Sequence, residues 1–263
     1  MTVLAFFMSA LFSACEKYNT DVVGTSFYPA NSLVSRFTHP VYVEYSDSDV
    51  RIWGPYQHEV ASQNSGTDLT ITTMSDSIAL IVYGYSRPDS LTTHDSSLRI
   101  ITDQDVAVYL NNVSMRSSTG MPFEVECPSS VITYLVIPAK SVNRFHDTDT
   151  IPSPHCGCIS VGGELYFTGI GQLNASSVCG NAISSVGTMV CNYATSVNAS
   201  TVMGSALSTE GADIRLIKGT WKLYADDPDA IINTCGATVY LGDEAKLYLN
   251  DSLYVIPAEP EQP

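Results

Sequence analysis

Hydrophobic residues in the C-terminal half of the chain recur at a constant spacing of 24 residues. One set comprises Ile159, Ile183, Leu207 and Ile231, and a second comprises Leu173, Val197, Trp221 and Ala245. A fixed period of this length is typical of solenoid proteins, in which each repeat forms one coil that stacks on the next. We therefore expect each set to form a column of neighbouring side chains, with Trp221 in the core.

Hydrophobic and polar positions also alternate within each repeat, as in the segment from Gln172 to Ser177. This alternation indicates a strand with one buried face and one exposed face. A repeat of 24 residues with turn residues between short strands has no room for a pair of helices. The pattern predicts an all-β fold, with a parallel β-helix of about 24-residue coils in the C-terminal half and coils stacked about 4.8 Å apart.

The middle strand of the repeat departs from this regularity. Odd-numbered positions look buried in two copies (Leu165, Met189), whereas even-numbered positions such as Ile214 look buried in the next. Because a slip of one residue reverses the faces of a strand, we expect a bulge or an altered turn near Ile214.

The rest of the chain contains strand-like runs separated by Ser, Asp, Gly and Asn, and no change of composition marks a domain boundary. The segment 144–155 breaks the period and is interpreted as a loop. We expect a signal peptide at 1–14, a lipid-anchored tether at 15–39, one β-helix domain at 40–255 and a disordered tail at 256–263.

The N-terminal run before Cys15 is apolar and too short to span a bilayer, and small residues precede the cysteine. This pattern resembles a bacterial lipoprotein signal and predicts lipidation of Cys15. We therefore expect an extracytoplasmic location, anchored by lipid to the outer membrane or cell surface of a Gram-negative bacterium, with no other membrane contact. The six remaining cysteines are interpreted as buried thiols or disulfides, because no second ligand pair completes a zinc site around His155, Cys156 and Cys158.

The chain carries 12 Lys and Arg against 27 Asp and Glu, a formal net charge of −15. Such a charge repels phosphate backbones and anionic lipid surfaces, and it excludes nucleic acid as a main partner.

Several segments resemble a bacterial carbohydrate-binding domain family formerly classed as a domain of unknown function. They include the run from Pro40 to Tyr56, Leu110–Met115, Asn143–Asp147 and the C-terminal coils. The resemblance implies a right-handed β-helix similar to that of polysaccharide lyases, which binds plant-type or acidic polysaccharides with calcium. The family's repeated Asp-Gly-Ile is replaced here by Asn181-Ala182-Ile183, Ser205-Ala206-Leu207 and Asp229-Ala230-Ile231, so one coil keeps the acid.

A cluster of acidic residues is the candidate calcium site. Asp226, Asp227 and Asp229 lie at a predicted coil corner, and Asp251 belongs to the following coil. Calcium binds several oxygen ligands at once, so these four carboxylates could hold it. The alternative is a proline-containing turn in which the carboxylates cap backbone amides.

The outward positions of the last coils are the candidate carbohydrate site. The 24-residue period places Tyr224 beside Tyr248 and Lys222 beside Lys246, with Asn174 and Asn198 in the same surface. Aromatic faces and planar polar groups suit a sugar. We expect an exported, non-catalytic polysaccharide-binding protein with no catalytic residues. The alternatives are a structural or adhesive surface solenoid without glycan binding and, less favoured, a β-helical polysaccharide lyase.

Overall fold

The computed structural model describes residues 33–46, 49–84, 95–150 and 157–254. The chain divides into two compact units, Met1–Arg36 and Phe37–Pro263, and the second unit contains all the described strands. Cys15, the signal peptide, most of the tether and the tail 256–263 lie outside the described residues. No helix among the described residues is long and apolar enough to cross a membrane.

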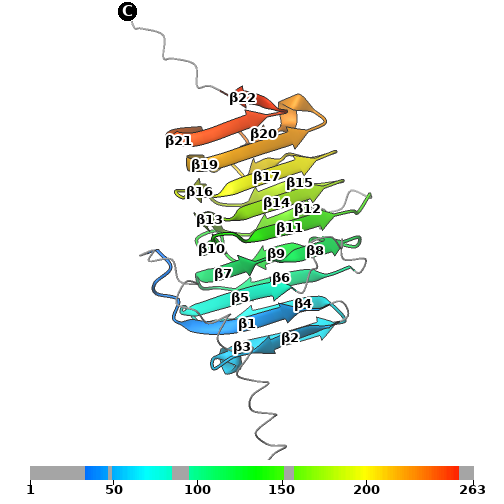
Figure 1. Ribbon diagram of the computed structural model, residues 1–263, viewed down its shortest axis with the longest axis vertical. Helices are drawn as coiled ribbons and strands as arrows, with labels where there is room; N and C mark the ends of the chain where they lie inside the picture. The colour runs from blue at the N-terminus through cyan, green and yellow to red at the C-terminus, as the bar shows by residue number, and fades with distance from the viewer. Residues whose placement is uncertain (1–32, 47–48, 85–94, 151–156, 255–263) are drawn as a thin grey trace, which may run out of the picture. The chain divides into compact units, whose positions relative to one another are not determined.

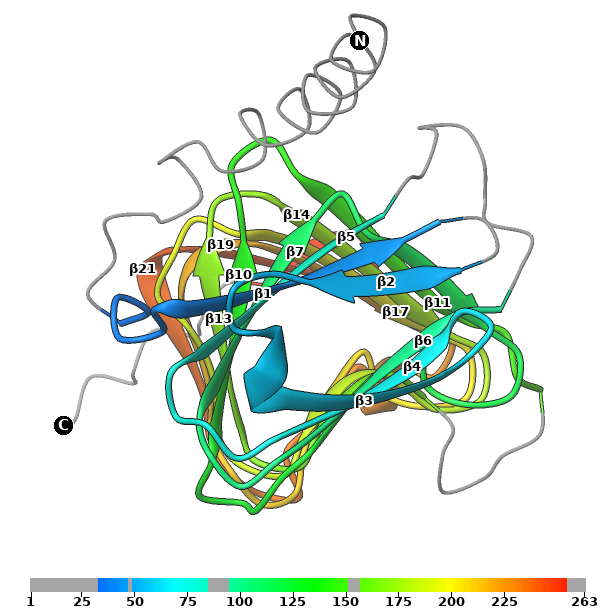
Figure 2. The ribbon, with the colours of Figure 1, turned by 90° about the horizontal axis from the view of Figure 1, so that it is seen from below.

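The second unit is a parallel β-solenoid of about six turns with coils of about 26 residues, which confirms the predicted fold class. Its parallel strands stack in chain order along one axis (Figure 1), and a view along that axis shows three sides around a common interior (Figure 2). Two very short 3-10 helices complete the described secondary structure, at η1 (Gln57–Glu59) and η2 (Pro228–Ala230).

We call the three sides of the solenoid side 1, side 2 and side 3. Side 1 contains β2 (Val50–Trp53), β1 (His39–Tyr45), β5 (Ile78–Gly84), β7 (Val106–Asn111), β10 (Ile132–Ile137), β13 (Glu164–Gly169) and β16 (Met189–Cys191). Side 2 contains β8 (Ser114–Ser117), β11 (Val142–Asp147), β14 (Gln172–Ser177) and β17 (Ser196–Thr201). Side 3 is a separate sheet of β3 (Val60–Ser65), β4 (Asp68–Thr73), β6 (Ser97–Thr102), β9 (Phe123–Glu126), β12 (Gly157–Val161), β15 (Asn181–Ser185), β18 (Leu207–Thr209) and β20 (Ile232–Asn233).

Two long strands join sides 1 and 2 at the C-terminal end. The first part of β19 (Ile214–Ala225) pairs with β16 and its second part pairs with β17, and β21 (Val239–Leu249) follows β19. The chain crosses the corner at Gly219, where φ is +97° and an added Cβ would lie 2.4 Å from the Thr195 carbonyl oxygen. Only glycine fits this close approach without a shift of the backbone.

Antiparallel strands flank the parallel stack at both ends. At the N-terminal end β2 pairs antiparallel with β1, and β3 pairs antiparallel with β4. At the C-terminal end β22 (Ser252–Tyr254) pairs antiparallel with β21. These strands are the outermost strands at their edges and end the parallel pairing there.

The predicted core columns are confirmed for three coils and wrong for the fourth. Ile159, Ile183 and Leu207 are hydrogen-bonded neighbours and fully buried, as predicted, but the next partner in register is Ile232. Ile231 is still buried, at 5% exposure. The 3-10 turn η2 precedes it and lengthens this coil by one residue.

The second column behaves in the same way. Leu173, Val197 and Trp221 are neighbours, but Trp221 pairs with Leu247 and not with Ala245, because the longer turn at η2 adds one residue and the register shift between Leu216 and Lys218 adds another. Trp221 is fully buried and its ring meets Phe167 edge-on, with centroids 5.2 Å apart, which confirms its place in the core.

The expected slip near Ile214 lies in the preceding turn. Met189 pairs with Ile214, a step of 25 residues, whereas β18 before this turn and the second part of β19 step by 24. The turn between Thr209 and Ile214 holds one extra residue, and the corner between Leu216 and Trp221 is one residue shorter than its counterpart in the preceding coil. The two changes cancel, so side 2 returns to its original register.

Candidate functional site

The outward side chains of side 2 form two straight rows. Parallel pairing places the first row in the order Ser114, Arg144, Asn174, Asn198, Lys222 and Tyr248. The second row is Arg116, His146, Ser176, Ser200 and Tyr224. We call these eleven residues the polar strip. Strands in a sheet lie about 4.8 Å apart, so the first row is about 24 Å long.

Hydrogen bonds order the middle of the polar strip. Asn198 Nδ2 donates to Asn174 Oδ1 at 2.8 Å, and Asn174 Nδ2 donates to the Asn143 carbonyl at 3.2 Å. His146 Nδ1 lies 2.5 Å from Ser176 Oγ. The amides and the imidazole are therefore held in fixed orientations before any ligand binds.

A shallow hollow of about 300 Å³ lies over β14, β17 and β19. Its polar lining is Asn174, Ser176, Asn198, Ser200 and Tyr224. Tyr224 donates to Asp251 Oδ1 at 2.6 Å, and this hydrogen bond raises the pKa of the phenol. The hollow thus presents amides, hydroxyls and one aromatic ring to a ligand.

The cations of side 2 have no ionic partner among the described residues. Arg116, Arg144, Lys222 and Lys246 make no ion pair there, whereas strand cations elsewhere do. Arg215 lies 3.0 Å from Asp213, for example, and Lys218 lies 2.7 Å from Glu244. In a chain of net charge −15, side 2 is locally basic.

The structure brings most of the predicted carbohydrate site together but corrects its register. Asn174, Asn198, Lys222 and Tyr248 share the first row, and Tyr224 lies in the second. The predicted stacks of Tyr224 on Tyr248 and Lys222 on Lys246 are wrong, because β21 is shifted by two residues from the 24-residue period. Lys222 is the neighbour of Tyr248, and Lys246 pairs with Thr220 outside the two rows.

Six residues of the polar strip were not predicted from the sequence: Ser114, Arg116, Arg144, His146, Ser176 and Ser200. Arg144 and His146 fall in the segment interpreted as a loop, but residues 142–147 form β11. The inward residues of β11 include Asn143 and Asp147, both fully buried, so the usual apolar alternation is absent. Asn143 Oδ1 accepts from Val113 N at 2.9 Å, and Asp147 Oδ2 accepts from Ser177 Oγ at 2.7 Å. Alternation around Phe145 is the one signal that could have identified this strand.

His146 is neutral at neutral pH. Burial lowers the pKa of its imidazole below the usual value, and the nearby positive charge of Arg116 lowers it further. A neutral imidazole can both donate and accept hydrogen bonds.

Two of the four carboxylates predicted to bind calcium accept hydrogen bonds within the protein. Asp227 Oδ1 accepts from Asp229 N at 3.0 Å and caps η2, and Asp251 accepts from Tyr224. Asp226 is exposed. The described ranges contain no group of three or more His, Cys, Asp or Glu residues that could hold a metal ion. The geometry matches the alternative of a capped turn, and calcium binding stays a prediction.

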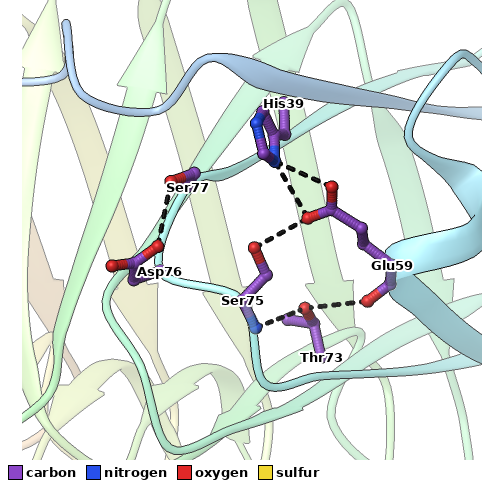
Figure 3. A network of polar contacts seen from close by, with 6 residues as sticks. All are labelled: His39, Glu59, Thr73, Ser75, Asp76 and Ser77. Carbon is purple, nitrogen blue, oxygen red and sulfur yellow. Dashed lines mark hydrogen bonds and ion pairs between the residues drawn. The ribbon is translucent and has the colours of Figure 1, made fainter.

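A second polar network lies at the N-terminal end of the solenoid (Figure 3). The Glu59 carboxylate lies 2.9 Å from His39 Nδ1 and accepts from Ser75 Oγ at 2.8 Å. The Ser75 hydroxyl therefore donates to the Glu59 carboxylate and makes no contact with His39, which pairs with the same carboxylate. The network ties β1 and η1 to the turn after β4, a structural role.

The prediction of buried thiols or disulfides holds for three cysteines and is wrong for two, because Cys127 is a half-buried free thiol and Cys235 an exposed one. Cys158 and Cys191 are fully buried free thiols, and burial raises the pKa of Cys191 to about 11. Cys179 is disulfide-bonded. His155 and Cys156, of the sequence His-Cys-Gly-Cys, lie outside the described residues.

Comparison with protein-family models, with curated proteins and with solved structures finds no match for this chain.

Proposed function

We propose that this protein is an exported, non-catalytic protein that binds polysaccharide along the polar strip. The observation that carries the proposal is the pair of parallel rows of amide, hydroxyl and phenol groups around the hollow on side 2. These groups recur at a regular spacing along one direction, and a polysaccharide also repeats its hydroxyl groups along one direction.

The chemistry of the hollow favours a sugar ligand. Amides and hydroxyls exchange hydrogen bonds with sugar hydroxyls, and the ring of Tyr224 offers a flat apolar face to a sugar ring. Asn174 and Asn198 are already held by hydrogen bonds to one another and to the backbone. Binding therefore orders few additional side chains, which lowers its entropic cost.

The same surface gives little support for catalysis. A lyase requires a base beside acidic groups or a metal that stabilise the developing charge. The described strands of side 2 direct no carboxylate outward, since Asp147 is fully buried.

Export is supported by the disulfide at Cys179, because disulfides persist mainly in oxidising compartments. Lipid anchoring through Cys15 is the accompanying prediction. Palmitate labelling in the native host should be lost in Cys15→Ser, and labelling that persists in this variant would refute the anchor.

The second candidate function is a rigid surface spacer. It is favoured by the continuous buried core, which runs from Val41 in β1 to Leu247 in β21. A spacer needs no ligand, so it predicts that the wild-type protein binds no glycan.

Retention on a panel of insoluble and soluble polysaccharides tests the proposal, with and without chelator. We expect the wild type to be retained and Tyr224→Ala with Asn198→Ala to lose at least about tenfold in affinity, at an unchanged melting temperature. Tyr240→Ala is the matched control, since Tyr240 is exposed and lies outside the polar strip. Loss of retention with chelator would indicate calcium, new unsaturated chain ends would indicate a lyase, and no retention at all would indicate the spacer.

A further inference from the structure

We propose that Arg116, Arg144 and His146 form a subsite for an anionic group, a carboxylate or a sulfate, at the β8 end of the polar strip. The inference rests on the proposed function and extends it to a ligand class, an acidic polysaccharide held by cationic side chains without a metal ion. None of these three residues belongs to the set predicted from the sequence.

The three side chains lie on adjacent strands of one surface. His146 on β11 is the direct register partner of Arg116 on β8. Arg144 is two residues before His146 and therefore points to the same outward face. An anion above His146 would meet one guanidinium group from each strand.

Arg116 has an unmet hydrogen-bonding capacity. Its Nε is buried and has no acceptor, and no described carboxylate pairs with its guanidinium group. Arg99 on side 3 is the contrasting case, because Glu124 lies 3.4 Å away and Glu126 also pairs with it. A ligand cannot reach the buried Nε itself, so an anion would bind the outer nitrogens of the guanidinium group, which pair with no described carboxylate.

The acidic groups near the subsite have other partners. Asp147 follows His146 but is fully buried and accepts from Ser177. Asp95 accepts from Ser118. The outward residues of the flanking strands are Ser114 on β8 and Asn174 and Ser176 on β14, which carry no charge.

A further cation, Lys222, defines the line along which a polyanion would run. Lys222 lies in the row of Arg144, three strands further along, at a distance of about 14 Å. Asn174 and Asn198 lie between the two cations and match the uncharged part of a sugar chain. A polyanion running across the strands can therefore contact both cations at once, and the planar guanidinium groups suit the two oxygens of a carboxylate or sulfate.

The test compares polymers that share a backbone and differ in charge. The carboxylate pair is polygalacturonate and its methyl ester, and the sulfate pair is dextran sulfate and dextran. We expect Arg116→Ala with Arg144→Ala to lose at least about tenfold in affinity for the charged member of the preferred pair. Binding of the uncharged member should not change, and chelator should not affect wild-type binding. Higher salt should weaken only the charged interaction.

Arg99→Ala is the matched control, because it removes an arginine that is already ion-paired. The melting temperature of each variant is measured, and Arg116→Gln with Arg144→Gln serves if the alanine variant unfolds. Wild-type binding to charged and uncharged members with equal affinity would overturn the subsite while leaving the proposed function intact. Equal losses in the Arg99 control, or abolition by chelator, would also overturn it. Absence of any glycan binding would instead refute the proposed function.

Discussion

The outer surfaces of side 3 and side 2 differ in whether their arginines form ion pairs. On side 3, Arg99 is held between Glu124 and Glu126 of the neighbouring strand. On side 2, Arg116 and Arg144 stand beside uncharged or basic neighbours and have no ion pair with a described carboxylate. The two surfaces share one solenoid and one core, so the difference lies in the outward residues alone. An arginine that is ion-paired across strands links those strands, whereas an arginine without an ion pair can bind an anionic ligand.

Outward residues of the solenoid should be replaceable without disturbing the core behind them. Trp221 and Lys222 are neighbours in β19 and point in opposite directions, one fully buried and one exposed. We expect Trp221→Ala to lower the free energy of unfolding by about 3–5 kcal/mol, because it leaves a cavity beside Phe167. Lys222→Ala should change it by less than about 0.5 kcal/mol. Urea unfolding measures both, and similar losses in the two variants would contradict the separation of core and surface.

A carboxylate placed in the polar strip should make side 2 resemble side 3. Asn198 is the register partner of Lys222, so Asn198→Asp would neutralise that cation. We expect affinity for an acidic polysaccharide to fall about tenfold, which corresponds to about 1.4 kcal/mol. Ser208→Asp on β18 of side 3 is the matched control and should leave affinity unchanged. Equal effects of the two substitutions would mean that net charge, and not the polar strip, governs binding.

Acidification should strengthen binding to side 2 through His146. Burial lowers the pKa of His146, so the imidazole is neutral at pH 7. It gains a positive charge only when the pH falls below the ordinary pKa of a histidine. We expect affinity for a sulfated glycan to rise about two- to threefold between pH 7 and pH 5.5, because sulfate stays ionised throughout. Calorimetry on the wild type and His146→Gln measures the effect, and an equal rise in the variant would assign it elsewhere.

The smallest expected effect concerns the ion-paired N-terminal end. Hydrogen bonds from His39 and Ser75 lower the pKa of Glu59, so its contribution to stability is present above the unfolded pKa. That contribution is lost as the pH falls through the lower folded pKa. Glu59→Gln should therefore melt slightly earlier than the wild type at pH 7, and the two should converge at acidic pH. A constant difference at all pH values would show that the carboxylate charge is unimportant.

The fold could be predicted where the turns keep their length. Ile159, Ile183 and Leu207 align because the connecting segments are equal, and alternation identifies the strands around them. The pairing of Tyr224 could not be predicted, because a turn and a bulge in the last coil each add one residue and move its partner. Arg144 was missed for a different reason. Its strand buries Asn143 and Asp147, whose hydrogen bonds replace the apolar contacts that sequence patterns reveal.

The reversed strands at the ends of the stack bear on how this molecule behaves at high concentration. A further parallel coil requires a strand that runs in the same direction as its neighbours. Because β2, β3 and β22 run the other way, a second molecule that approaches there meets the wrong hydrogen-bond pattern for continued winding. Growth into fibres, the characteristic hazard of repetitive sheets, is therefore disfavoured at these edges.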